Sequence, residues 1–534
     1  MKKLFCTFFV GVLLFSCSSV QTYNEQIAAF HPVKGLRKDV DKAYTKLQKL
    51  HPQLYTYISK ENLDYKFDSL KKTITKPLSS RKFYEKLAPV VAEVRQGHIR
   101  VIPPTRQFTN KESKLIKKKK FEFYDLDFEY LSNALWIKGT RGADSTIIGN
   151  KVVKINNEPI SEIIERYKKL FSSDGYNTTF QNRAVGLQFS KFYYIDKGYL
   201  DSLTITFQNE DSLFTKTFRR IAKDSISGIS KIDSLNNKPK KLTKDEKLAQ
   251  KLKDRQKRKD DYKYGYEKSK KRYTRNFNFI DKDSSIAYLK IRSFNNGKFK
   301  DFYQESFTKI DSAKANFLIL DLRDNTGGRL AEIDKLYSYL TDKDYQLIEK
   351  GETLTRLPYL KMMTSKNNSS FLKILAGLLS PGIIINNLTK SSKKNGKLYF
   401  KFSSAKVKKP NPLNFKGDIY VLINGSSFSA SSILSTNLHA TKRATFIGEE
   451  TGGAYNGTVA GIFRTIELPN SKVKMNIGLV QIEAPYNMEP NGFGIKPDIE
   501  IIPTIEDRKN NIDPELEWVL NTIQTKKGKI VLKD

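Results

Sequence analysis

The 534-residue sequence is poor in cysteine and histidine, and these shortages exclude several classes of protein. It contains two cysteines and four histidines, and none of the Cys-His spacings of a zinc finger appears. Aromatic RNA-binding signatures and the heptads of a basic zipper are also missing. The net charge of +37 comes from lysines spread along the chain, a composition that keeps many proteins soluble. We therefore expect no nucleic-acid partner.

Long hydrophobic runs are also missing after the first 17 residues, and none approaches the length of a transmembrane span. The sequence begins with MKK, then the apolar LFCTFFVGVLLF and SCSS, a pattern typical of a signal peptide. LLFSC, ending at Cys17, resembles a bacterial lipobox, whose cleavage leaves an acylated cysteine; an ordinary secretory signal is the alternative. We predict a lipoprotein signal at 1–17, lipidation at Cys17 and attachment to the bacterial cell envelope, facing the periplasm. Cys6 would leave with the signal, so no intrachain disulfide is expected.

Hydrophobic residues nevertheless make up 39% of the sequence, with 33 Phe and 27 Tyr, which excludes disorder along its whole length. A chain of this size suggests about three domains. Apolar spacings of three and four residues predict a helical region over 22–118, with Ser79 or Ser80 as a helix N-cap and Gly97 as a stop. Over 119–222, alternating stretches such as FEFYDLDFEYL predict strands, with one helix at SEIIERYKKLF.

A charged segment separates these regions from the rest of the chain. We assign 223–275 as a basic linker, because residues 238–275 are saturated with lysine, arginine and acidic residues. A solvated helix or linker explains such a segment. The alternative is an anchor to anionic lipid headgroups that would cooperate with an acylated Cys17.

From about residue 276, strands and helices alternate. SSIAYLKIRSF, ANFLILDLRDN and GDIYVLING are strand-like, and GGRLAEIDKLYSYL begins a helix, which predicts an α/β layer with a largely parallel sheet over 276–505. An insertion at 355–412 contains the apolar FLKILAGLLSPGIII, which fits either a buried cap helix or a flap over a site. A C-terminal helix is expected over 506–534.

The stretch NGSSFSASS, from Asn424 to Ser432, follows one of these strands. A serine hydroxyl at a sharp strand-to-helix turn can act as a nucleophile when a base accepts its proton and N–H groups stabilise the oxyanion. The local pattern does not match G-x-S-x-G, because Ser429 stands where the second glycine belongs. By itself, this pattern also fits an ordinary structural turn.

Two other stretches could supply the missing groups. LILDLRDNTGGRL places Gly327 and Gly328 in a turn after a strand, where glycine permits positive φ and a close backbone approach. EVRQGHIRV places His98 between a predicted helix and a strand. A lone histidine is more often structural, so His98 gains weight only in combination with the serine and the glycine turn.

In combination, these stretches resemble the tail-specific, or C-terminal processing, serine peptidases, in their tricorn-like branch. The resemblance covers most of the mature chain, excluding the basic segment and the insertion. Its blocks are HPQLYTYI, EVRQGHIRV, GNKVVKINNEPI, IAYLKIRSF, LILDLRDNTGG, YVLINGSSFSASSIL, FIGEETGG, GFGIKPDIEI and DPELEWVLNTI. It implies a multidomain α+β and α/β protein with an N-terminal helical region, a PDZ-like β-rich domain and a ClpP/crotonase-like protease core. The PDZ-like domain would capture extended peptides by strand addition.

The resemblance also implies a catalytic set: Ser429 as nucleophile, His98 as base, and Glu489, directly or indirectly, as the group that stabilises the imidazolium. Glu483 is a weaker candidate for the third position. The oxyanion donors would be the backbone N–H groups of Ala430 and of a glycine in the Gly327–Gly328 turn.

The sequence also departs from the family pattern. Ala454 stands where the processing-protease branch has a lysine base, Gln96 replaces an acid before Gly-His, and Ser432 replaces a glutamate. We therefore predict a His-based serine endopeptidase that acts on peptides or unfolded proteins through an acyl-enzyme. No metal or cofactor is required. The alternative is a catalytically inactive, peptide-binding scaffold of the same fold.

Overall fold

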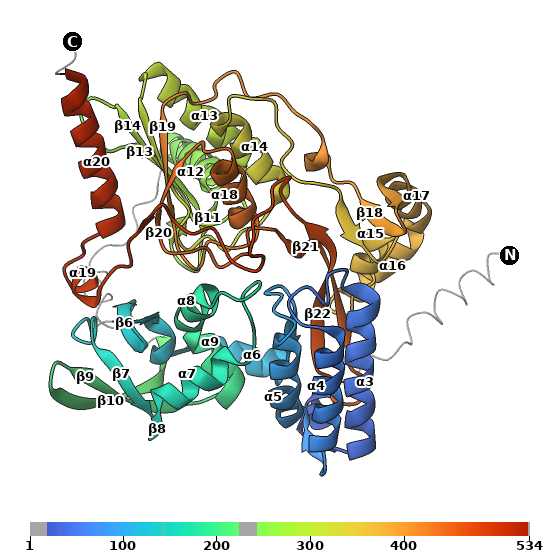
Figure 1. The fold of residues 1–534 in the computed structure, drawn as a ribbon. Coiled ribbons are helices and arrows are strands. Elements are labelled where there is room, and N and C mark those ends of the chain that lie inside the picture. Colours follow the sequence, from blue (N-terminus) through green and yellow to red (C-terminus); the bar gives the residue numbers. More distant parts are fainter. Residues whose placement is uncertain (1–18, 143, 224–242, 532–534) are drawn as a thin grey trace.

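The computed structural model describes residues 19–142, 144–223 and 243–531 (Figure 1). The predicted signal peptide with Cys17 and the first part of the basic segment lie outside the described residues.

The N-terminal region is helical, and its helices pack directly on the rest of the protein. α2 (Val20–Ala28), α3 (Val33–Leu50), α4 (Lys60–Thr73) and α5 (Ser80–Ala92) follow one another, and a short ladder joins β1 (Phe30–His31) to β2 (Leu78–Ser79). Ser79 caps α5, as predicted, by accepting a hydrogen bond from the Lys82 N–H. The helix ends at Ala92, five residues before Gly97. Strand β3 (Arg100–Ile102) then joins a sheet of the C-terminal half, so His98 stands between α5 and that sheet.

Residues 119–222 form a separate sheet with its own hydrophobic core. Its strands follow the order β4 (Lys119–Phe121), β10 (Ser212–Ala222), β9 (Ser202–Asn209), β7 (Lys151–Ile155), β6 (Ala134–Thr140) and β5 (Leu126–Leu131), with β8 (Glu158–Pro159) paired to β7. The helix expected at SEIIERYKKLF is α7 (Ile160–Lys168). Two further helices, α8 (Thr179–Leu187) and α9 (Phe189–Lys197), were not predicted, and residues Glu122–Asp125 form a 3-10 turn rather than part of a strand. α6 (Asn110–Lys117) precedes this sheet.

The described part of the basic segment is an exposed helix, α12 (Lys244–Tyr264), with no buried residue. Its N-terminus carries a capping box between Thr243 and Glu246, and Gly265 ends it in the left-handed conformation. A short ladder of β11 (Tyr266–Glu267) and β12 (Arg272–Tyr273) leads into the central sheet.

The central sheet has the order β13 (Arg275–Phe279), β14 (Ile286–Ile291), β15 (Phe317–Asp321), β19 (Asp418–Ile423), β20 (Thr445–Gly448) and β23 (Ile499–Glu500). The neighbours from β14 to β23 are parallel, and β13 is antiparallel. Both faces are buried, since alternate residues of β15 belong to two different cores. That two-sided burial explains the unbroken apolar run FLIL.

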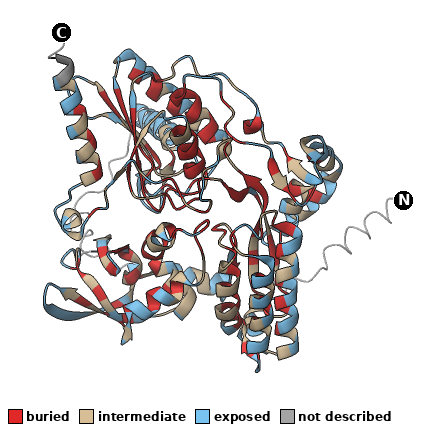
Figure 2. Ribbon diagram, viewed as in Figure 1, coloured by how far each residue is buried: buried red, intermediate tan, exposed pale blue. Residues whose placement is uncertain are grey.

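Helices cover both faces of this sheet (Figures 1 and 2). α13 (Phe299–Ser312), α14 (Leu330–Leu340) and α18 (Ala430–Ala440) contribute to the larger core, which also includes the N-terminal helices. The predicted C-terminal helix is α20 (Pro514–Val531), which follows the short α19 (Ile505–Lys509) and covers the other face with Val519 and Ile523. The buried residues shown red in Figure 2 concentrate around these strands and α18.

A second sheet joins the two halves of the chain. Its order is β17 (Ser391–Lys394), β18 (Lys397–Phe400), β16 (Gly351–Thr353), β22 (Lys474–Ile482) and β21 (Thr458–Glu467), and β3 pairs with β22. The insertion at 355–412 contributes β17, β18, a 3-10 turn at Ser403–Ala405 and the helices α15 (Pro358–Met363), α16 (Ser370–Leu378) and α17 (Ser380–Lys390). The β21–β22 pair therefore runs from the central layer to the N-terminal helices.

Candidate active site

The serine-rich stretch forms the sharp turn between strand β19 and helix α18. Ser429, immediately before the helix, has φ 58° and ψ −120°, a conformation that residues other than glycine rarely adopt. Such strain costs about 1–3 kcal/mol and is concentrated at functional sites. Among the residues of this turn, Ser429 therefore stands out by its backbone alone.

The neighbouring Ser427 and Ser432 have structural roles, because their hydroxyls bond to backbone groups of the turn. Ser427 accepts from the Asn424 N–H at 3.1 Å and donates its hydroxyl to the Leu322 carbonyl at 2.8 Å. Ser432, which replaces the expected glutamate, donates to the Ser427 carbonyl at 3.0 Å. A Cβ on Gly453 would lie 2.3 Å from the Ser432 Oγ, so the Gly-Gly turn packs tightly against this side chain. A structural hydroxyl at position 432 explains that departure from the family pattern.

The structure brings His98 to Ser429. His98 Nε2 lies 3.0 Å from the Ser429 Oγ, and its Nδ1 lies 2.9 Å from the Thr458 Oγ1. The two ring nitrogens thus have separate partners on two sides of the imidazole. With hydrogen on Nδ1, Nε2 is free to accept the serine proton, which is the arrangement that a general base needs.

Aromatic rings hold the imidazole in place. His98 stacks on Phe428 at 4.8 Å and on Phe463 at 5.7 Å between ring centroids, with interplanar angles of 24° and 25°. Phe428 stacks in turn on Phe180 of α8 at 4.3 Å. A register shift in the β21–β22 ladder lies just before Phe463. The imidazole therefore packs against Phe428 of the serine turn and Phe463 of β21, and Phe180 of the 119–222 unit packs against Phe428.

A buried carboxylate near His98 was missed by the sequence analysis. Asp174, in the loop between α7 and α8, is fully buried, and its Oδ1 accepts the Gly97 N–H at 2.8 Å. Hydrogen bonds from Thr458 and from the Ala454 N–H also favour its charged form. Neither of these two groups makes a hydrogen bond of good geometry, since the Asp174 Oδ2 has no partner among the described residues, so the Gly97 bond is the best-formed contact of this carboxylate. The family pattern has an acid at position 96, where this chain has Gln96. Asp174, distant in sequence, places a carboxylate against the neighbouring Gly97 instead.

The protonation of both groups is shifted by their surroundings. Burial raises the pKa of Asp174 to about 7, against the opposite effect of its hydrogen bonds. Burial, and to a lesser extent the charge of Arg100, lowers the pKa of His98 to about 3. No salt bridge to Asp174 occurs among the described residues. In the part of the chain that the structure describes, Asp174 is a buried carboxylate without an ion-pair partner, and it bonds the residue next to a histidine that bonds a strained serine. Shifted pKa values in such a cluster are typical of functional sites.

The predicted third residue, Glu489, is placed elsewhere. It is exposed, and its carboxylate accepts the Asn491 N–H of its own loop at 3.0 Å. Glu483, the weaker candidate, accepts from the Gln481 side chain at 3.4 Å. Burial raises the Glu483 pKa, and repulsion from Glu349 and Glu352 adds to that effect. Within the described part of the chain neither glutamate bonds to His98, and the Nδ1 of His98 lies against the Thr458 hydroxyl instead, so Glu489 makes no direct hydrogen bond to the imidazole.

The glycine turn lies against the nucleophile, as predicted. Gly327 has φ 96°, and a Cβ there would lie 2.7 Å from the Ser429 Cβ and 2.8 Å from the Ala430 N. Its own N–H is occupied, because it donates to the Asn325 Oδ1 at 2.9 Å. The N–H groups of Ala430 and Gly328 donate to no acceptor among the described residues. These two groups therefore remain as oxyanion donors.

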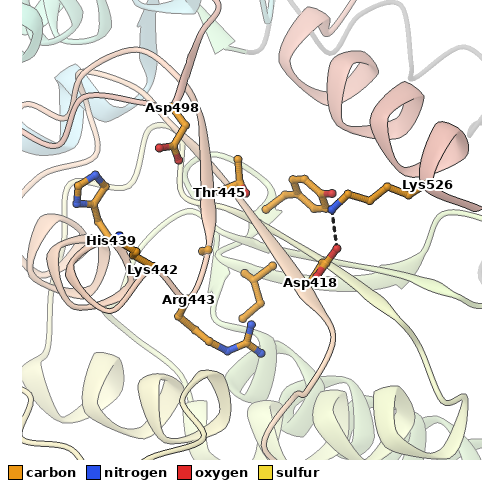
Figure 3. Close-up of a pocket in the computed structure, with 10 residues that line it drawn as sticks. Asp418, His439, Lys442, Arg443, Thr445, Asp498 and Lys526 are labelled. Carbon is orange, nitrogen blue, oxygen red and sulfur yellow. Dashed lines mark hydrogen bonds and ion pairs between the residues drawn. The ribbon is translucent and has the colours of Figure 1, made fainter. Parts of the chain in front are cut away.

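Another hollow lies at the opposite end of the same strands (Figure 3). It is lined near the start of β19 and β20, whereas Ser429 follows the carboxyl end of β19. Lys526 pairs with Asp418 at 2.7 Å across it, and Asp498 accepts the Phe446 N–H. Asp418, Lys526 and Asp498 thus serve structural bonds, and the hollow does not belong to the candidate active site.

Comparison with known proteins identifies the C-terminal half. Residues 285–501 match Peptidase family S41. The chain contains a peptidase family S41 domain. This family is one of serine peptidases. Ser429, Thr458 and the Gly327–Gly328 turn lie inside the S41 domain, whereas His98 and Asp174 are contributed by the segments before it.

Individual relatives agree with this assignment. The chain is 24% identical over 231 residues to carboxyl-terminal-processing peptidase 1, chloroplastic, of Arabidopsis thaliana, a match covering 43% of this chain and 36% of that protein. The structure of mature CPAF complexed with lactacystin aligns with a TM-score of 0.58 at 14% identity, over 94% of this chain and 99% of that chain. Another structure of mature CPAF gives 0.55 at 14% identity, over 89% and 94%. The likeness to CPAF shows that the fold extends beyond the S41 domain.

Proposed function

We propose that the protein is a serine endopeptidase that hydrolyses peptides or unfolded proteins, with Ser429 as nucleophile and His98 as base. The observation that carries the proposal is the 3.0 Å hydrogen bond between the Ser429 Oγ and the His98 Nε2 in an S41 fold. This geometry favours an active peptidase over an inactive peptide-binding scaffold. A Ser-Lys dyad is disfavoured because Ala454 stands at the lysine position, which supports the His-based, tricorn-like branch.

The chemistry follows from the two hydrogen bonds of the imidazole. His98 Nε2 accepts the Ser429 proton as Oγ attacks the scissile carbonyl, and the Ala430 and Gly328 N–H groups stabilise the resulting oxyanion. The imidazolium then gives its proton to the leaving amine, which leaves an acyl-enzyme. Water, activated by the same imidazole, attacks the ester and releases Ser429.

Thr458 and Asp174 would set the tautomer of His98. If the Thr458 hydroxyl donates toward Asp174, its oxygen is left to accept the Nδ1–H of His98. The ionised aspartate thereby fixes hydrogen on Nδ1 and stabilises the imidazolium through one hydroxyl. We assign Thr458 and Asp174 as positioning residues, in the role that the sequence analysis gave to Glu489.

Binding and location extend this proposal. The 119–222 unit, with the predicted PDZ-like strand–turn–strand GNKVVKINNEPI, would bind an extended segment of substrate. Arg183 of α8 pairs with Glu449 at 2.8 Å, and the same carboxylate accepts the Gly425 N–H at 3.0 Å, so this unit is tied to the nucleophile turn. The signal-like N-terminus and the LLFSC pattern support a lipid-anchored envelope protein that faces the periplasm.

Hydrolysis of an unstructured protein such as casein tests the proposal, with mass spectrometry of the products to show internal cleavage. Ser429→Ala and His98→Ala should each lower kcat/KM by about 10⁴-fold or more. Ser427→Ala is the matched control: it removes a neighbouring hydroxyl that we assign to the turn, and should retain at least part of the activity. Full activity of a folded Ser429→Ala chain would overturn the proposal.

A further inference from the structure

The insertion contains a group of exposed apolar side chains on two consecutive helices. Helices α16 and α17 bury only Ala376 and Asn387. Phe371 is 72% exposed, Leu378 74% and Ile385 63%. Four further apolar side chains of the pair are exposed: Leu372, Ile374, Leu379 and Leu388. Phe371, Ile374 and Leu378 are spaced three and four residues apart, so they share one face of α16, and an exposed apolar face of this kind marks an interaction site.

This hairpin projects from a fixed base. In Figure 1, α16 and α17 lie together at one end of the molecule, away from the strands of the 119–222 unit. The Asn387 side chain accepts the Tyr359 N–H of α15 at 3.0 Å, and Lys366 N–H donates to the Thr465 carbonyl of β21 at 2.9 Å. The exposed surface is therefore presented by a structured element, and the expectation of a buried cap helix does not describe these two mostly exposed helices.

The charge of the surrounding segment has one sign. Residues 354–417 contain 13 lysines and arginines and no aspartate or glutamate. Lys393, Lys394 and Lys401 are exposed on or beside β17 and β18, the hairpin that follows α17. These three lysines form no ion pair with any described residue. An apolar surface beside unpaired lysines is complementary to an anionic lipid bilayer, which offers an apolar interior beneath a negative surface.

The helix lengths favour the membrane interface over a span. No single helix of the described chain is long and apolar enough to cross a membrane. Among the helices of residues 19–142, 144–223 and 243–531, only α16 and α17 together reach that length and composition, and they meet at a bend of 73°. At 1.5 Å per residue, each helix is about 14–17 Å long, about half the thickness of the hydrocarbon core.

The start of the described chain lies near the base of the α16–α17 hairpin. The hydroxyl of Tyr23 in α2 has its pKa raised by burial and by the charge of Glu467, and Glu467 lies 3.9 Å from the Lys366 Nζ at the base of the hairpin. Cys17 precedes the first described residue by two positions. An anchor at Cys17 and the hairpin could therefore engage one bilayer.

We propose that the α16–α17 hairpin inserts into the surface of an anionic bilayer, with Phe371 and Leu378 below the headgroups and Lys393 and Lys394 beside them. Charge complementarity and the projection of the apolar side chains carry this proposal. It does not depend on hydrolysis by Ser429.

A tryptophan reporter tests the insertion while the full chain is held on vesicles by its own N-terminus. Phe371→Trp is made in a Trp136→Phe/Trp518→Phe background, and Leu213→Trp in the same background is the control. Leu213 is 66% exposed at the start of β10, in the 119–222 unit. Vesicles contain phosphatidylcholine with 30% phosphatidylglycerol, with or without brominated acyl chains.

Brominated lipid should quench the Phe371→Trp fluorescence at least twofold and leave the control unchanged. Lys393→Gln/Lys394→Gln should reduce this quenching in anionic vesicles, because each lysine near an anionic surface contributes about fivefold to binding. Equal, weak quenching of both reporters would overturn the proposal. Protection from aqueous acrylamide without quenching by brominated lipid would also overturn it, and would assign the surface to a protein contact such as a second copy.

Discussion

The Ser429 site and the α16–α17 hairpin are built in opposite ways. The site collects Ser429, His98, Thr458 and Asp174 from four distant segments, and its groups are held by hydrogen bonds and stacked rings. The hairpin is one continuous stretch whose apolar side chains face outward. Proton transfer at Ser429 depends on residues that only the tertiary fold brings together. Insertion of the hairpin depends on the composition of one short stretch. Substitutions in one region should therefore leave the other intact.

The largest effect short of removing the nucleophile or base is expected at the glycine turn. Gly327→Ala would place a Cβ 2.7 Å from the Ser429 Cβ and 2.8 Å from the Ala430 N, so Ser429 or the oxyanion donors must move. We expect kcat to fall by about 10²–10³-fold, the effect of losing one oxyanion donor. Gly377→Ala in α16 is the control, because no atom lies within 4 Å of its added Cβ. Steady-state kinetics that show equal activity for both variants would contradict this steric account.

Asp174→Asn should act through the tautomer of His98. The amide would donate to Thr458 and turn its hydroxyl toward Nδ1, which places the imidazole hydrogen on Nε2 and blocks proton acceptance. We expect kcat/KM to fall by about 100-fold, less than for a directly bonded aspartate. In the wild type, kcat/KM should decline as pH falls below about 7, where Asp174 becomes protonated. The variant should lose this limb, because His98 remains neutral down to much lower pH.

Asp174→Asn, which should lower activity, should increase the stability of the fold. The folded-state pKa of Asp174 is raised, so its contribution to stability is fully present below about pH 4 and lost as pH rises through 7. Asp174→Asn removes the buried charge and should raise the free energy of unfolding at pH 8 by about 2 kcal/mol, with little change at pH 4. Denaturant unfolding at both pH values measures this. A variant destabilised at pH 8 would indicate a structural role for Asp174.

Thr458→Val should have a smaller effect on the same relay. Valine keeps the shape of the side chain but leaves His98 Nδ1 without its partner, so kcat/KM should fall by about tenfold. Thr458→Ser retains the hydroxyl and should restore most of the activity. Activity of Thr458→Val equal to that of Thr458→Ser would remove Thr458 from the mechanism.

The smallest effects on hydrolysis are expected outside the site. Glu489→Gln should change kcat/KM on a soluble peptide by less than about twofold, because an exposed carboxylate that bonds only to its own loop contributes little. Leu378→Glu/Ile385→Glu should be equally silent in this assay, and in the Phe371→Trp reporter it should abolish quenching by brominated lipid. A large loss of peptide hydrolysis in either variant would show that the two regions are coupled.

The sequence predicted the parts of the protein that local patterns encode. The apolar strands of the central sheet, the Ser79 cap and the Gly327–Gly328 turn all have short-range signals, and the structure has strands, a cap and a turn at these places. Ser429, His98 and Gly327 were found because each lies at the end of a strand or helix in a recognisable block.

Asp174 and Thr458 carry no such signal. Asp174 lies in SSDGY, a loop without periodicity, and only the docking of the 119–222 unit brings it to Gly97. Thr458 resembles any strand residue until β21 places its hydroxyl beside the His98 Nδ1. Glu489 was chosen by its spacing from the GIKPD block, but spacing along the chain does not show that its loop turns the carboxylate outward.

Labelling by a fluorophosphonate probe, with the modified peptide mapped by mass spectrometry, tests the central claim that His98 activates Ser429. The wild type should label at Ser429, and His98→Ala should lower the labelling rate by at least about 10³-fold without unfolding the chain. Labelling at Ser429 with undiminished rate in His98→Ala, or at another serine of the turn, would contradict the account.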